Sequence, residues 1–173
     1  MHCDRTLPAL LKTFLDILLI RRGPEELPSS RLLYYGSMVA SVLISMIATV
    51  VIFPDAEPRH ELTLLLTVIT LVFYSLVLIL AGFGNRLLQT LTAVFGVDAL
   101  FTAMYVFAFT AVGLVAEKQT AMVMTWMISY WLVPVQGHII SRAIEKHWFV
   151  GIGFALALHI MMLLVYQQLS NQV

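Results

Sequence analysis

Long apolar stretches recur along the chain and are separated by short polar connections. A helix needs about 20 apolar residues to cross the roughly 30 Å hydrocarbon core of a bilayer, because it rises 1.5 Å per residue. Asp98 is the one charged residue within the five stretches. The pattern therefore predicts an all-α, polytopic bundle of five transmembrane helices, over residues 32–53, 62–83, 87–116, 120–141 and 148–166.

The segment before the first stretch has a different pattern. Its apolar residues repeat at helical spacing, whereas Lys12 and Asp16 lie on the opposite side and would interrupt the apolar core of a signal peptide. We expect an amphipathic helix in the cytoplasmic membrane interface, followed by an elbow at Pro24 and Pro28. The predicted domains are an N-terminal helix and elbow over 1–30 and a five-span bundle over 31–173. The apolar residues of the helix are Leu7, Leu10, Leu11, Phe14, Leu15, Leu18 and Leu19.

Composition supports a membrane protein and excludes several other classes. Hydrophobic residues make up 60% of the 173 residues and charged residues 12%, about half the share in an ordinary soluble domain. Ten Lys and Arg balance ten Asp and Glu, so no overall positive field is available to attract nucleic acid. Cys3 is the single cysteine, which excludes an intramolecular disulfide and a cysteine-rich metal centre.

The basic residues predict the orientation, since cytoplasmic flanks of membrane spans carry an excess of Lys and Arg. With a cytoplasmic N-terminus, Arg59 and Lys118 lie outside and the other eight basic residues inside, so we expect the C-terminus on the periplasmic side. The eight are Arg5, Lys12, Arg21, Arg22, Arg31, Arg86, Arg142 and Lys146.

Hydroxyl side chains form a stripe on each of the first two spans. Small and hydroxyl residues mark helix contact faces in membranes, so the stripes predict that these two spans pack on each other. The alternative is a hydrophilic pathway between them. The stripes are Ser37, Ser41, Ser45 and Thr49 on the first span, and Thr63, Thr67, Thr70 and Tyr74 on the second.

Asp98 needs a partner, because an acid at the bilayer centre costs about 2.5–3.5 kcal/mol on insertion scales. It lies eleven residues after Leu87, His159 lies eleven after Trp148, and Tyr130 lies eleven before Ser141, so all three share one depth. The cluster predicts either a buried hydrogen-bonded contact or a proton relay or ion site. Alternatively, residues 85–96 are interfacial and Asp98 begins a shorter span over 99–116.

His138 is the remaining candidate, near the cytoplasmic end of the fourth span. Pro134 is expected to kink this span and free a backbone carbonyl. His138 and His159 differ in depth by eight residues, about 12 Å, which excludes a shared haem. No metal ion or other cofactor is expected.

The order of segments resembles the Yip-domain family of small five-span membrane proteins. The resemblance rests on residues 14–28, 32–53 and the glycine-broken 81–86. The Asp-Leu-Tyr-Gly-Pro motif of eukaryotic members is absent, with Arg22-Gly23-Pro24 as its nearest counterpart. The family is linked to membrane trafficking and small-GTPase association in eukaryotes. The compact chain is more similar to bacterial members, which implies an inner-membrane location.

Motifs of common enzymes are absent from the sequence, including His-Glu-x-x-His, Gly-x-Ser-x-Gly and the phosphate-binding loop. Together with the interfacial helix and the hydroxyl contact faces, this predicts a non-enzymatic scaffold or assembly component whose partners are the lipid bilayer and another membrane protein or a second copy of itself. The alternative hypothesis is a small transporter, or the membrane subunit of one, that uses Asp98, Tyr130 and His159.

Overall fold

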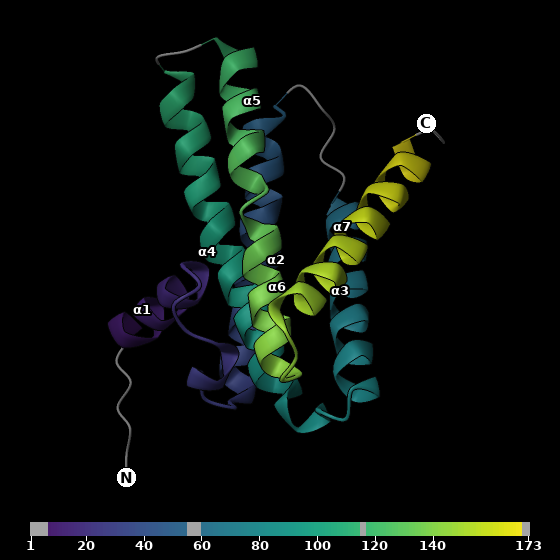
Figure 1. The fold of residues 1–173 in the computed structure, drawn as a ribbon. Helices are drawn as coiled ribbons and strands as arrows, with labels where there is room; N and C mark the ends of the chain where they lie inside the picture. Colours follow the sequence, from purple (N-terminus) through teal and green to yellow (C-terminus); the bar gives the residue numbers. More distant parts are fainter. Residues whose placement is uncertain (1–6, 55–59, 115–116, 171–173) are drawn as a thin grey trace.

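The computed structural model describes residues 7–54, 60–114 and 117–170, and every regular element among them is helical (Figure 1). This confirms the predicted all-α class. The elements in chain order are α1 (Leu7–Leu18), η1 (Pro24–Glu26), α2 (Arg31–Ile52), α3 (His60–Leu80), η2 (Gly84–Arg86), α4 (Leu87–Gly113), α5 (Lys118–Ser129), α6 (Leu132–Ala143) and α7 (Trp148–Ser170).

Four helices of the described chain are long and apolar enough to cross a membrane. They coincide, within a few residues, with the first, second, third and fifth predicted spans. This supports a multi-pass membrane protein. The four segments are Arg31–Ile52, His60–Leu80, Gly84–Gly113 and Trp148–Leu169.

The fourth predicted span is divided into α5 and α6, which have twelve residues each and follow one another end to end (Figure 1). The break lies at Tyr130 and Trp131, one turn before Pro134. Proline has no N–H to donate to the carbonyl four residues earlier. The Tyr130 carbonyl instead accepts from the backbone N–H of Val133 at 3.3 Å. The expected interruption is therefore present, and the freed carbonyl is satisfied by backbone.

The first half of α4 is the centre of the bundle. Every residue from 90 to 97 is buried, and α2 packs along this helix more extensively than any other element. Because α4 runs unbroken from Leu87, Asp98 lies within a long helix and does not begin a shorter one. The alternative in which Asp98 is the N-terminal residue of a helix over 99–116 is therefore wrong, whereas the membrane depth of residues 85–96 stays a prediction.

The apolar side of α1 packs largely on protein. Phe14, Ile17 and Leu18 are buried, and the Phe14 ring lies so close to Gly96 of α4 that a Cβ at Gly96 would overlap it. Leu11 remains exposed on the same helix. The expectation that this whole side lies among acyl chains is therefore corrected for Phe14 and Leu18, and Ile17, which was not assigned to that side, is buried as well.

The hydroxyl stripe of α2 faces α4 as well as α3. Ser37 and Ser41 are buried, and Ser41 donates to Asp98 of α4, whereas contacts between α2 and α3 are sparse. The expectation of a direct seam between the first two spans is corrected. Their stripes are separated by a cavity, which agrees with the alternative arrangement.

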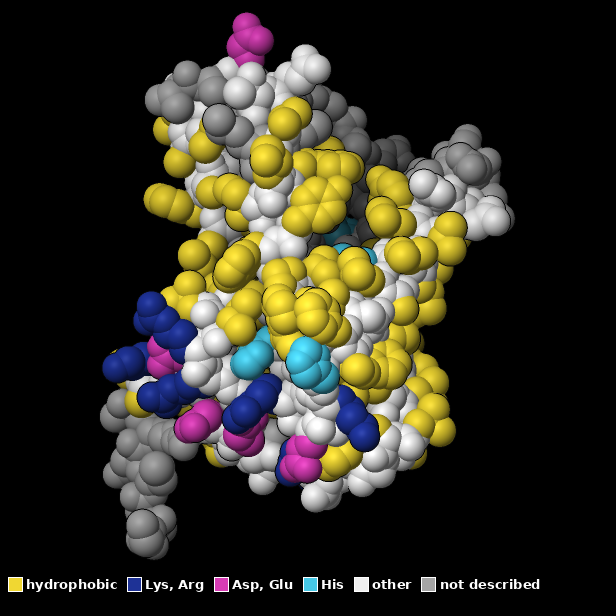
Figure 2. All heavy atoms as spheres, in the orientation of Figure 1, with side chains coloured by type: hydrophobic (Ala, Val, Ile, Leu, Met, Phe, Trp, Pro, Cys, Tyr) yellow, Lys and Arg dark blue, Asp and Glu magenta, His cyan; other side chains and the backbone are white. Residues whose placement is uncertain are grey.

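Charged side chains gather at the end of the bundle where α1 and the elbow lie, below a largely hydrophobic surface (Figure 2). α2 begins at this end and α7 finishes toward the other (Figure 1). Cys3, Arg5 and Arg59, which entered the predictions above, lie outside the described residues.

Candidate functional site

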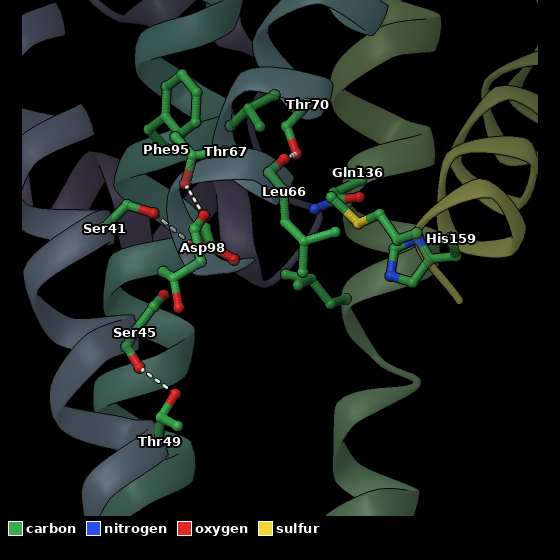
Figure 3. Close-up of a pocket in the computed structure, with 14 residues that line it drawn as sticks. Ser41, Ser45, Thr49, Leu66, Thr67, Thr70, Phe95, Asp98, Gln136 and His159 are labelled. Carbon is green, nitrogen blue, oxygen red and sulfur yellow. Dashed lines mark hydrogen bonds between the residues drawn. The ribbon is translucent and has the colours of Figure 1, made fainter. Parts of the chain in front are cut away.

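A cavity of about 220 Å³ lies inside the bundle, between α2, α3, α4, α6 and α7 (Figure 3). Its wall is mixed: apolar side chains alternate with polar ones. Asp98, Gln136 and His159 line it, together with six hydroxyl side chains: Ser41, Ser45, Thr49, Thr63, Thr67 and Thr70.

The Asp98 carboxylate joins α4 to α2. The Ser41 hydroxyl donates to Asp98 Oδ2 at 2.5 Å, a length typical of charge-assisted O–H···O⁻ bonds. Asp98 can hold this position because its helix turn follows directly on the buried stretch that α2 packs against. The carboxylate is thereby fixed at the cavity wall.

His159 lies on the opposite wall of the same cavity (Figure 3). Its Nδ1 lies 2.9 Å from the Ala155 carbonyl one turn earlier. A carbonyl only accepts, so Nδ1 carries the hydrogen and Nε2 of the neutral ring is an acceptor. The cavity thus contains two of the three groups predicted to cluster.

Tyr130, the third member, is not among the residues that line the cavity. It sits at the break between α5 and α6 and is 66% exposed. Equal depth along two helices brings side chains together only if both helices also turn the correct face inward. The predicted hydrogen-bonded cluster is therefore not formed: Asp98 and His159 share the cavity, but Asp98 binds Ser41 and His159 binds the Ala155 carbonyl.

Gln136 lines the cavity and binds Tyr74, which lies one turn beyond Thr70 on α3, and we call this pair the floor of the cavity. Sequence reasoning did not assign Gln136 to the candidate site and placed Tyr74 only on the hydroxyl stripe. The fully buried Tyr74 hydroxyl donates to Gln136 Oε1 at 3.1 Å. Val135, Ile139 and Leu158, all completely buried, add to the apolar core. Gln136 carried a usable signal, since an amide within an apolar span requires a partner.

The cavity extends away from that floor. Thr49 lies three residues before the end of α2, and Thr63 lies three residues after the start of α3. Both are within one turn of the helix ends opposite the elbow. The cavity therefore reaches toward the end of the bundle that is away from α1.

His138 belongs to a different part of the structure. Its Nε2 lies 3.2 Å from the carbonyl of Arg22, so it contacts the elbow and does not line the cavity. Two further side chains bind backbone carbonyls of the N-terminal segment: Trp131 Nε1 donates to Leu18 at 3.1 Å, and Gln89 Nε2 donates to Leu27 at 2.9 Å. The elbow is thus fastened to α4 and α6.

Glu25 and Arg142 add an ion pair to this attachment. Burial opposes ionisation of Glu25, but a hydrogen bond from its own backbone and the adjacent Arg142 guanidinium outweigh burial and hold the pKa of Glu25 below its ordinary 4.5. The pair therefore contributes at neutral pH and weakens as the pH falls through this lowered pKa. Both groups are largely exposed, so the contribution is modest.

The arrangement offers hydrogen-bonding groups and one carboxylate to a small polar molecule. Among the described residues, no group of three or more His, Cys, Asp or Glu side chains is placed to hold a metal ion. Comparison of the chain with protein-family models, curated proteins and solved structures found no match.

Proposed function

We propose that the chain crosses a membrane five times, with α5 and α6 together forming the fourth crossing and the N-terminus in the cytoplasm. The end-to-end placement of α5 and α6 between α4 and α7 supports the five crossings (Figure 1). The concentration of basic residues at the α1 end supports the orientation. The resemblance to bacterial Yip-domain proteins adds the inner membrane to this proposal.

Labelling of single cysteines with a membrane-impermeant maleimide tests the topology. Cys3 provides the N-terminal position, and Cys3→Ser combined with Gln167→Cys provides a position near the end of α7, where Gln167 is exposed. We expect Cys3 to react in inside-out vesicles and the engineered cysteine to react in right-side-out vesicles. Reaction of both from one side would contradict an odd number of crossings.

We further infer that the protein is a non-enzymatic carrier of a small polar solute, or the membrane subunit of one. The observation that supports this function is the polar cavity with the Asp98 carboxylate at its wall. Ionisable side chains within membrane spans mark substrate and ion pathways, and small-molecule sites are concave with a few fixed polar groups. A floor at Tyr74 and Gln136, with the cavity extending toward the other end, is the form expected of a site accessible from one side.

The scaffold function stays a prediction with less support from the contacts. The hydroxyl faces on which it depended are used within the chain, since Ser41 binds Asp98 and the α3 stripe lines the cavity. A second copy or another membrane protein would have to bind elsewhere on the bundle.

Uptake into proteoliposomes tests the carrier function. The probes are glycerol and urea, followed by light scattering, and labelled sodium and methylammonium. We expect at least one probe to enter faster than into protein-free vesicles, and Asp98→Asn to reduce that rate about tenfold, as expected for loss of a charge-assisted interaction. His159→Ala should reduce it as well.

Correct folding of both variants, checked by gel filtration and thermal unfolding, separates the two functions. If the protein is a carrier, Asp98→Asn and His159→Ala keep the fold and lose uptake. If it is a scaffold, the same variants lose folding or assembly. No accelerated uptake of any probe by the parent protein, or equal uptake by Asp98→Asn, would overturn the carrier function.

A further inference from the structure

We propose that the cavity binds a small monovalent cation, an alkali metal ion or a primary ammonium group, with the Asp98 carboxylate as its principal ligand. This rests on the proposed carrier function and names the class of its solute. The inference is carried by the direction of the hydrogen bonds around the cavity.

Three of the four threonine hydroxyls at the cavity donate their hydrogen atoms to backbone carbonyls of their own helices. Thr49 Oγ1 donates to the Ser45 carbonyl at 3.0 Å, Thr67 Oγ1 to the Thr63 carbonyl at 2.8 Å, and Thr70 Oγ1 to the Leu66 carbonyl at 2.9 Å. A hydroxyl has one hydrogen and two lone pairs. The oxygen of each therefore offers lone pairs to the cavity, which favours a positively charged or hydrogen-donating guest.

Polar groups from the other helices also act mainly as hydrogen-bond acceptors toward the cavity. Ser41 donates its hydrogen to Asp98, which as a carboxylate accepts only, and with its hydrogen on Nδ1 the uncharged form of the His159 ring has Nε2 as an acceptor. The Gln136 amide is the exception: its oxygen is occupied by Tyr74, so its NH₂ group is the part left to donate. An anion would therefore meet the Asp98 carboxylate and these acceptor oxygens at the polar part of the wall.

Charge and size then limit the cation. No Lys or Arg occurs among the described residues that line the cavity, so ionised Asp98 has no Lys or Arg partner there and one bound monovalent cation would balance its charge. Oxygen ligands select hard cations and ammonium groups, and the described residues offer no three-residue cluster for a transition metal. A volume of about 220 Å³ holds several molecules of water size, about 30 Å³ each, and so accommodates a partly hydrated ion or a small organic ammonium.

Thermal unfolding of the purified protein in detergent tests the site directly. Sodium, potassium and methylammonium chlorides are compared at equal ionic strength with N-methylglucamine chloride, whose cation is a bulky secondary ammonium. We expect at least one small cation to raise the unfolding midpoint saturably, since a ligand that binds only the folded state stabilises it. A shift with sodium or potassium indicates a metal ion as the ligand, whereas a shift with methylammonium indicates an ammonium group.

Three variants locate the effect. Asp98→Asn should abolish the cation-dependent shift. Thr67→Val keeps the shape of the side chain but removes its oxygen, and should weaken the apparent affinity several-fold, whereas Thr67→Ser keeps the hydroxyl and should retain binding. The Thr67 pair keeps the test decisive if Asp98→Asn does not fold.

The proposal is overturned if no small cation shifts the midpoint, if N-methylglucamine acts equally, or if Thr67→Val binds as well as the parent. These outcomes differ from failure of the carrier function. Uptake of glycerol or urea without any cation effect would leave a carrier with a neutral solute. Cation binding without uptake of any probe would support the cation site and contradict the carrier function.

Discussion

Gly151→Ala is expected to destabilise the protein by about 1–3 kcal/mol, the usual cost of forcing an extra methyl group into a packed interface. A Cβ at this position would overlap the backbone carbonyl of Gly137 and press on the Ser141 side chain. The obstacle is backbone, so relief requires α6 and α7 to separate. Thermal unfolding in detergent, followed by circular dichroism, measures the loss.

Gly153→Ala is the matched control, two residues along the same helix. A Cβ there meets nothing within 4 Å, so alanine should be neutral or slightly stabilising through its better helix propensity. Of these two glycines, only Gly151 lies at the crossing of α6 and α7. Equal midpoints for the two variants would show that α6 and α7 do not pack through Gly151.

Tyr74→Phe is expected to destabilise the protein by about 1–3 kcal/mol, because it leaves the buried Gln136 oxygen without its donor. The phenyl ring keeps the packing of Tyr74, so the loss reports the hydroxyl alone. Tyr166→Phe is the control, since Tyr166 lies near the end of α7 and is about half exposed. The same unfolding measurement compares the two variants.

A double-mutant cycle with Gln136→Leu then isolates the bond at the floor of the cavity. Removing both polar partners should cost clearly less than the sum of the two single changes, because no buried group is left unsatisfied. Strict additivity of the two changes would show that Tyr74 and Gln136 are not coupled. Such a result would also remove the proposed closure of the cavity at this end.

Helix positions could be predicted from the sequence because apolar length is a direct requirement of the bilayer. The ends of α2, α3, α4 and α7 depend on that requirement and on local signals such as Ser30, whose side chain caps α2 at the Leu33 N–H. Which helices are neighbours does not follow from length. For that reason α2 was expected beside α3, although its main partner is α4.

The candidate site was predictable in part for the same reason. Counting residues from the helix ends gives depth, and depth indicated Asp98 and His159. Rotation about the helix axis is set by tertiary packing, which a single sequence does not reveal, and Tyr130 accordingly points elsewhere. To predict partners such as Ser41 and Gln136, both the depth and the rotation of each helix must be known. These partners are therefore identified only from the packed structure.

The bond between Ser41 and Asp98 has a consequence for biogenesis. The two residues are 57 positions apart, and α2 leaves the ribosome well before α4. α2 is therefore synthesised first, and its Ser41 hydroxyl is available to bind Asp98 when α4 follows. If α4 entered the bilayer alone, Asp98 would have no hydrogen-bond partner during insertion. If α2 is still next to the translocon at that stage, Ser41 can bind Asp98 as it enters.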